Sequence, residues 1–372
     1  MKDRKLYNIF ITITSFAKLL IEIFIPLFLY NKEFGINDIL FFYLITFITI
    51  FISAIPTSFL GEKIKFKNTM ILSTIFFSAF NVYVNFVNNK LGLIILGIIN
   101  GLYLVLYWVG RHLFGVSIIK EKQTTDNVSL YMIFTIIGSI PASYIGAILI
   151  DKLNYFYLSL IVFLISLVSI IPLSKIKTNL KKHKINIKNI IKTYPKRNYI
   201  FYFFDQFKFM TILLFPLYIY LNISKTLEFI GITNIVIGIS SVIYIYFLSK
   251  LMDNKKKSFL KPMLLFLFLT FLIKLNSNTK TIMIIIIFIE GIFKSALDTI
   301  ILRNTYSYCK DYDNVSYITF IEMLYALFRI IVITLLLSLK ISLKGILYIG
   351  TFSLLINTFI GFKEGKNGYE QN

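Results

Sequence analysis

Long apolar runs recur along the whole chain and constrain its fold more than any other feature. A run of about 20 apolar residues is long enough to cross a lipid bilayer as a helix. The lengths of the runs, without short alternating segments, predict helices rather than the strands of a barrel. The sequence therefore predicts an all-α integral membrane protein with twelve transmembrane helices, near residues 6–30, 36–60, 69–88, 91–115, 129–150, 155–174, 199–221, 226–250, 258–275, 281–302, 315–339 and 343–362.

Composition agrees with a membrane protein and excludes several other classes. Hydrophobic residues make up 57% of the chain and charged residues only 15%, which is too apolar for a soluble domain with one core. Cys309 is the one cysteine, so an intrachain disulfide and a cysteine-rich metal site are excluded. The first apolar run continues to Tyr30, past the length of a signal-peptide core, and predicts an uncleaved first span.

The basic residues predict the orientation. Of the 39 lysines and arginines, 26 fall on the side of the N-terminus, five fall within spans, and the rest, Lys32 and Lys274 among them, fall on the other side. Loops rich in Lys and Arg stay in the cytoplasm. We therefore expect a multi-pass protein of the cytoplasmic membrane with both termini inside. The lipid bilayer accounts for the net charge of +21, and no nucleic-acid partner is expected.

A basic segment at 175–198 divides the spans into six and six. This predicts an N-terminal six-helix bundle at 1–174, a cytoplasmic linker, and a C-terminal bundle with a short tail at 199–372. The linker fits a solvated segment near anionic headgroups better than a specific binding site. The halves echo each other, since Asp-Asn-Val-Ser opens the fifth span at 126–129 and the eleventh at 313–316. Such internal repeats are a known plan of secondary transporters.

Two loops carry a resemblance to a known family. The segment 58–67 is similar to the G-x-x-x-D-R-x-G-R-K loop of the major facilitator superfamily, with Glu62 acidic and Lys63 basic; Ser58 and Lys65 replace glycines. The segment 249–257, with Asp253, is the expected second copy. The resemblance implies two pseudo-symmetric six-helix bundles and a cytoplasmic gate at Glu62, Lys63 and Asp253. A carboxylate near a helix N-terminus beside a basic partner can favour one of two packings.

The fourth and fifth spans carry further family patterns. Residues 111–115 resemble the R-x-x-Q-G of facilitator fourth helices, with Phe114 in place of the amide, and in the family this arginine is associated with proton coupling. The stretch from Gly138 to Gly146 lacks the G-P-x-x-G-G of drug–proton antiporters but keeps a proline and spaced small residues. Those residues predict close helix packing or a kink.

Ionisable residues inside spans are costly and mark functional sites by default. Nine of the eleven lie on the first, fourth, seventh and tenth predicted spans, the helices that line the central cavity in the facilitator fold. Lys18 and Glu22 are four residues apart, as are Glu290, Lys294 and Asp298 in succession, so each set can pair along one helix face. Such pairs can also serve only to hold helices together. The remaining members are Arg111, His112, Asp205, Lys208, Glu322 and Arg329.

These features predict a secondary active transporter for a small molecule that works by alternating access. Proton-coupled efflux of a drug-like or lipophilic compound is the leading interpretation, with Glu22, Arg111 and His112 in proton coupling. The substrate cavity is assigned to Lys18, Trp108, Asp205, Lys208, Glu290, Lys294 and Asp298. Alternatives are proton-coupled uptake of a zwitterionic or anionic metabolite, an integral-membrane enzyme, and a transport-dead receptor or scaffold. We expect a monomer, no cofactor, no metal and no enzymatic activity, and no P-loop occurs in the sequence.

Overall fold

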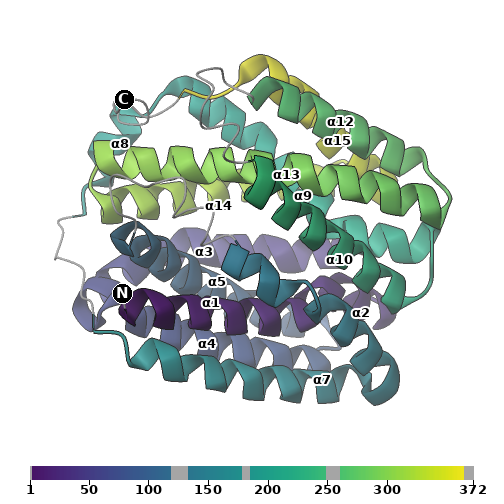
Figure 1. Ribbon diagram of the computed structural model, residues 1–372, viewed down its shortest axis with the longest axis horizontal. Coiled ribbons are helices and arrows are strands. Elements are labelled where there is room, and N and C mark those ends of the chain that lie inside the picture. The colour runs from purple at the N-terminus through teal and green to yellow at the C-terminus, as the bar shows by residue number, and fades with distance from the viewer. Residues whose placement is uncertain (1, 119–132, 178–184, 249–259, 364–372) are drawn as a thin grey trace.

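The regular structure is helical wherever the chain is described. A computed structural model describes residues 2–118, 133–177, 185–248 and 260–363. The elements (Figure 1) are α1 Lys2–Ile21, η1 Glu22–Phe24, α2 Ile25–Asn31, α3 Ile36–Ile64, α4 Phe66–Tyr83, η2 Val84–Phe86, α5 Lys90–Ile118, a helical segment at 133–139, α7 Ala142–Ser174, α8 Ile187–Thr193, α9 Lys196–Asn222, α10 Leu227–Ile243, the π-helical η4 Tyr244–Leu248, α12 Leu260–Asn276, α13 Lys280–Asp311, α14 Asn314–Ser338 and α15 Leu343–Ile360. The predicted all-α membrane fold is confirmed.

The helices account for the predicted spans in different ways. Within the described ranges, nine helices are long and apolar enough to cross a membrane. One of them, Ile133–Ser174, covers two predicted spans. Asn154 separates these spans, since it interrupts α7 with a φ of 71°. Its Oδ1 accepts the N–H of Phe156 at 3.0 Å. Helix α12 has only 17 residues, and α13 carries three charges in its apolar part. The count of twelve spans stays a prediction.

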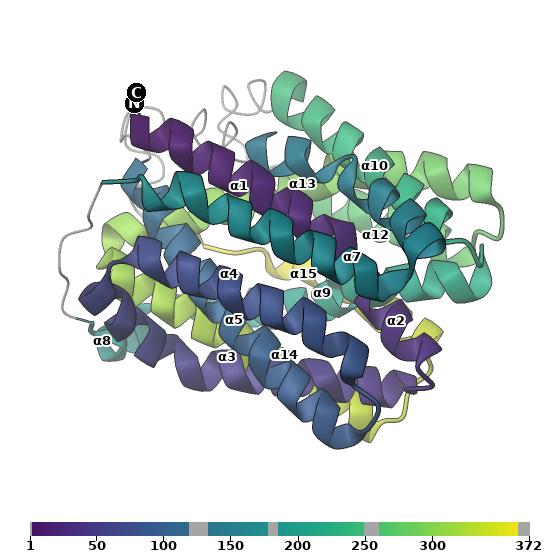
Figure 2. The same ribbon diagram turned by 90° about the horizontal axis from the view of Figure 1, so that it is seen from below.

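Both halves of the chain begin and end at one end of the molecule, which we call the linker end. The N–H of Lys177 lies 3.3 Å from Oδ2 of Asp3, and Asn198 exchanges hydrogen bonds of 3.0 and 2.6 Å with the backbone of Lys363. Figures 1 and 2 show the first turn of α1 and α8 at the same end. Each half therefore crosses the molecule an even number of times, as two six-helix units would.

The two halves meet mainly along two helix pairs. Helices of the first half lie in the lower part of Figure 1 and those of the second half in the upper part. Helix α14 packs on α3, and α10 packs on α7. At the linker end, Oγ of Ser58 lies 2.6 Å from Oγ1 of Thr319, and further along, Ser143 donates to the carbonyl of Gly231 at 3.4 Å. Helix α14 also contacts α5, and α2 contacts α9, so the halves touch along several helix pairs.

Small residues bring α1 against α7. A Cβ on Gly138 would lie 2.4 Å from the carbonyl oxygen of Thr12, and one on Gly146 would lie 2.0 Å from that of Leu20. Only glycine permits this approach, because any side chain would push the backbones apart. The helical segment 133–139 ends before Pro141, and α7 begins directly after this proline, at Ala142. The prediction of close helix packing or a kink in this stretch is confirmed.

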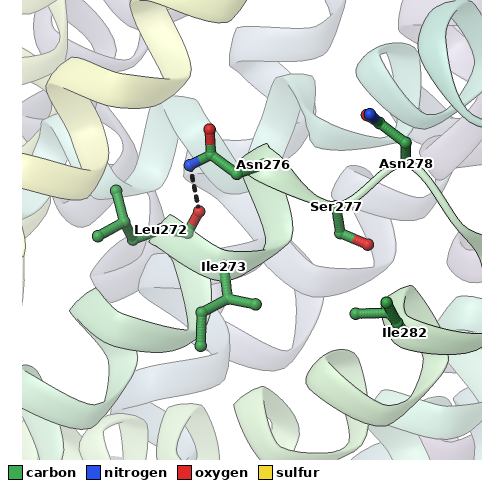
Figure 3. Close-up of a pocket in the computed structure, with 6 residues that line it drawn as sticks. All are labelled: Leu272, Ile273, Asn276, Ser277, Asn278 and Ile282. Atoms are coloured by element: carbon green, nitrogen blue, oxygen red, sulfur yellow. Dashed lines mark hydrogen bonds between the residues drawn. The ribbon is translucent and has the colours of Figure 1, made fainter.

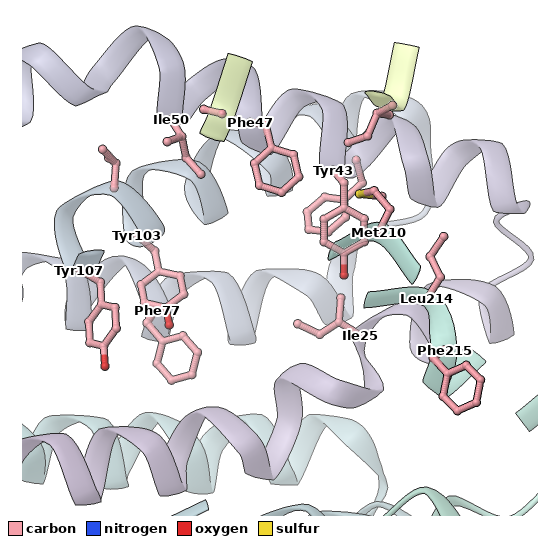
Figure 4. Packing of buried hydrophobic residues seen from close by; sticks show 14 of the residues in the cluster. Ile25, Tyr43, Phe47, Ile50, Phe77, Tyr103, Tyr107, Met210, Leu214 and Phe215 are labelled. Atoms are coloured by element: carbon pink, nitrogen blue, oxygen red, sulfur yellow. The ribbon is translucent and has the colours of Figure 1, made fainter. Parts of the chain in front are cut away.

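The apolar side chains divide between an interior and a lipid-facing surface. Figure 4 shows part of the interior, where Ile25, Tyr43 and Phe47 of the first half lie near Met210 and Phe215 of α9. Many other large apolar side chains lie exposed on the outer surface, for example those of Ile52, Leu164 and Phe359. Exposed apolar surface on this scale fits a lipid environment.

The central linker contains one short helix that the sequence did not predict. Helix α8 packs on α14, and the N–H of Asn186 donates to Oγ of Ser316 at 2.9 Å. Burial raises the pKa of the Tyr194 phenol, so its hydroxyl stays protonated at 3.4 Å from that of Tyr317. Asp313 caps α14 by accepting the N–H of Ser316. Its counterpart in the predicted repeat, 126–129, lies outside the described residues.

Candidate functional site

Glu22 lies at a break in the first transmembrane helix. Helix α1 ends at Ile21, a single 3₁₀ turn follows, and Pro26 near the start of α2 lacks the N–H that a continuous helix would need. The Glu22 carboxylate accepts a hydrogen bond of 3.0 Å from the Tyr103 hydroxyl and lies 3.7 Å from the Lys18 ammonium. The predicted pairing of Lys18 with Glu22 is therefore present. Broken helices recur at the binding sites of secondary transporters.

Three aromatic rings of α5 surround the Lys18 ammonium. Its Nζ lies 5.2 Å from the ring centroid of Tyr103, 4.6 Å from that of Tyr107 and 5.4 Å from that of Trp108. Tyr103 and Tyr107 share one face of α5 because they are four residues apart, and Trp108 directly follows Tyr107. We call the rings of Tyr103, Tyr107 and Trp108 the aromatic cage. Each distance is within the range at which a ring face attracts a cation.

Arg111 lies one helical turn beyond the cage and is buried. Its guanidinium donates to the hydroxyl of Tyr107 at 3.2 Å and to Oγ1 of Thr135 at 3.1 Å, and it lies 4.8 Å from the ring centroid of Trp108. The backbone carbonyl of Arg111 accepts the Tyr7 hydroxyl at 3.0 Å. Tyr107 thus contacts both cations that the sequence assigned to this region, Lys18 and Arg111.

His112 joins the two halves. Its Nε2 lies 3.6 Å from Oε1 of Glu322 on α14, and its Nδ1 lies 3.4 Å from the hydroxyl of Tyr306 on α13. On its own helix the imidazole stacks on Trp108, with centroids 5.4 Å apart. The sequence assigned His112 to proton coupling without a partner in the second half. Glu322 and Tyr306 provide one, and neither was among the assigned site residues.

The second half holds a cluster of mixed charge. Lys208 and Asp205, three residues apart on α9, form an ion pair of 2.6 Å, and Asp298 lies within electrostatic range of Lys208 and Lys294. Beside them, the guanidinium of Arg329 on α14 donates to Oε1 of Gln206 at 2.8 Å and lies 3.8 Å from the ring centroid of Phe209. Gln206 carries no charge, so it is not among the ionisable residues that mark functional sites within spans.

Glu290 does not pair with Lys294, contrary to the expectation from their spacing. Its carboxylate accepts a hydrogen bond of 2.6 Å from Lys274 of α12, whose ammonium also lies 3.6 Å from the ring centroid of Phe215 and 4.2 Å from that of Phe271. Lys274 was expected among the cations outside the membrane. Its side chain instead turns inward from the last turn of α12 and is only 3% exposed, because the buried carboxylate and two ring faces replace water around it.

The predicted gate is described in part. Helix α3 ends at Ile64, directly after Glu62 and Lys63, and Lys65 takes a φ of 76° before α4 begins. Glu62 and Lys63 thus lie at the linker end, near the bond between Ser58 and Thr319. Asp253 lies outside the described residues. The structure leaves the gating role of these residues a prediction.

One pocket opens between the facing ends of α12 and α13, away from the linker end. Figure 3 shows the six residues that line it: Leu272, Ile273, Asn276, Ser277, Asn278 and Ile282. It contains none of the predicted site residues and no charged side chain. Nothing about its lining points to a specific ligand.

The helix arrangement and the buried charges agree with a comparison against protein-family models. The chain matches the model described as Major Facilitator Superfamily over residues 8–273, which is more than half of its length. The chain therefore belongs to the major facilitator superfamily and is a multi-pass membrane transporter. A comparison with individual curated proteins found no match.

Proposed function

We propose that this transporter couples the efflux of a lipophilic small molecule to the inward movement of protons. The observation that carries the proposal is the contact of His112 with Glu322, because it places two proton-accepting groups across the junction of the halves. A contact across the junction must break when the halves separate at the linker end. Proton occupancy of these groups would thereby bias one arrangement over the other.

The moving units in this proposal are the bundles 1–174 and 199–372, joined by the linker 175–198. They rock about the central site with the termini in the cytoplasm, and Glu62, Lys63 and Asp253 bias the cytoplasmic gate. Glu22 is the favoured proton-binding carboxylate of the first half. Arg111 acts on it through Tyr107 and the aromatic cage, whose contacts reach both residues. The unit is a monomer without cofactor or catalytic activity.

The proposal is tested with purified protein in liposomes under an imposed pH gradient, against a panel of labelled lipophilic substrates. We expect at least one substrate to move against the direction of the proton gradient, and Glu22→Gln to abolish this movement while leaving exchange of substrate without a gradient. Glu322→Gln should uncouple in the same way. If no substrate moves when the pH gradient is imposed, and no substrate dissipates the gradient, the proposal of proton coupling is wrong.

A second candidate is proton-coupled uptake of a zwitterionic or anionic metabolite. The ion pair of Asp205 and Lys208, with Asp298 nearby, favours it because it offers both signs of charge within one region. The same liposomes separate the candidates. Uptake requires the labelled metabolite to accumulate on the side toward which protons flow.

A further inference from the structure

The aromatic cage is occupied by a cation that belongs to the chain itself. The Lys18 ammonium lies within 5.4 Å of all three ring centroids, and Glu22 supplies the opposite charge. Three π-faces with a carboxylate at one side are the chemistry that recognises substituted ammonium ions. The cage therefore already binds a cation, the ammonium group of Lys18.

Lys18 is held less tightly than the other buried ammonium groups. Lys274 and Lys208 each reach their carboxylate at 2.6 Å, which is hydrogen-bond distance, whereas Lys18 stays 3.7 Å from Glu22. The Glu22 side chain is also 28% exposed, compared with 4% for Glu290. A lysine ammonium on a flexible four-carbon stem can leave such a site without unfolding its surroundings.

We propose that the aromatic cage is the binding site for an organic ammonium ion, and that Lys18 occupies it as a tethered stand-in that the ligand displaces. The inference rests on the proposed transport function and names its substrate class. A quaternary or protonated tertiary ammonium takes the place of Nζ between the rings of Tyr107 and Trp108. Glu22 then balances the ligand, while the Lys18 side chain moves out of the cage.

The positive charges around the cage could instead favour binding of an anion. Arg111 lies 4.8 Å from the ring centroid of Trp108 and 5.5 Å from that of Tyr107, so it would attract an anionic ligand to these rings. Lys18 and Arg111 together would then favour a carboxylate over an ammonium ion. The assay must therefore compare a cation, its neutral isostere and an anion.

Trp108 makes the cage directly observable, because it is the single tryptophan of the chain. Purified full-length protein is titrated with choline, with 3,3-dimethyl-1-butanol as the neutral isostere and with benzoate, while the fluorescence of Trp108 is followed. We expect choline to change the fluorescence saturably and the two other compounds to do so only weakly. Lys18→Met, which removes the competing ammonium from the cage, should tighten choline binding roughly tenfold or more, since no tethered cation then competes with the ligand.

Matched variants separate the cage from a general loss of structure. Lys18→Arg keeps a cation between the rings and should bind choline about as weakly as the unchanged protein does, whereas Tyr107→Leu in the Lys18→Met background should lose the gain. Thermal unfolding in detergent shows which variants are folded. If folded Lys18→Met binds choline no more tightly than the unchanged protein, or binds the neutral isostere equally well, the proposal is wrong. A stronger response to benzoate also overturns it.

Failure of this inference and failure of the transport proposal give different results. If choline binds as expected but no substrate couples to a pH gradient in liposomes, the cage stands and proton coupling falls. If lipophilic compounds are transported with a gradient but Trp108 does not respond to ammonium ions, transport stands and the substrate class is wrong.

Discussion

Removing one partner of the Lys274–Glu290 pair should destabilise the protein far more than removing both. The pair is a hydrogen-bonded contact of 2.6 Å between α12 and α13, with side chains that are 3% and 4% exposed. At such burial neither water nor salt screens the remaining charge when its partner is lost. The perturbations are Glu290→Gln, Lys274→Met and the double variant.

The structure sets the order of the three effects. Loss of one partner from a buried pair costs about 3–5 kcal/mol. In Glu290→Gln the Lys274 ammonium keeps its contacts with the ring faces of Phe215 and Phe271, at 3.6 and 4.2 Å. The free energy of unfolding should therefore fall by an amount near the lower value, about 3 kcal/mol. In Lys274→Met the buried Glu290 carboxylate loses its hydrogen-bonded cation, and the loss of stability should approach about 5 kcal/mol. The double variant should lie within about 1–2 kcal/mol of the unchanged protein, because no unpaired charge remains and only one neutral side-chain amide has lost its partner.

The assay is unfolding in mixed detergent micelles followed by far-ultraviolet circular dichroism, analysed as a double-mutant cycle. Lys261→Met, which removes an exposed lysine from the same helix, is the control and should change the free energy of unfolding by less than about 0.5 kcal/mol. If the two single substitutions add to give the effect of the double variant, the pair is not coupled. The reasoning from burial would then be refuted.

Three further predictions concern other contacts. Gly146→Ala should destabilise the protein by about 1–3 kcal/mol in the same unfolding assay, because its Cβ would lie 2.0 Å from the carbonyl of Leu20; an unchanged stability would contradict the tight packing. Burial raises the pKa of the Cys309 thiol, so maleimide at pH 7 should label it only after unfolding, and rapid labelling of the folded protein would be the opposite result. In a Cys309→Ser background, Ser58→Cys with Thr319→Cys should form a disulfide on mild oxidation, and electrophoresis after cleavage of the linker would show fragments that stay joined; separate fragments would mean that these ends do not meet.

The fold could be predicted from local sequence because membrane spans are a local property. Runs of about 20 apolar residues identify helices without knowledge of their neighbours. The same locality explains the differences. The division at Asn154 falls between the predicted spans 129–150 and 155–174, whereas nothing in the composition of the first apolar run indicates the 3₁₀ turn at Glu22. Helix α8 is too short and too polar to stand out in a basic linker.

The site could be predicted as a set of residues but not as a set of contacts. Placing Lys18, Glu22 and His112 in spans needs only their positions in apolar runs. Their partners depend on which helices pack together, and Glu322 lies in the other half of the chain. Lys274 was misplaced because counting charges near span ends cannot distinguish a lysine that reaches water from one that turns inward to a buried carboxylate.

The ion pairs differ in what a rocking motion would do to them. Lys18 with Glu22 and Lys274 with Glu290 each lie within one half, so they would move as units when the halves separate. His112 with Glu322 crosses the junction and would break. A ligand in the aromatic cage would therefore stay with the first half while the linker end opens. Trp108 connects the two events, because it forms a wall of the cage and also stacks on His112. Displacement of Lys18 would then reach the junction through the ring of Trp108. Trp108→Leu should therefore separate ligand binding from proton coupling, with binding followed by labelled choline because the fluorescent side chain is gone, and coupling followed in liposomes.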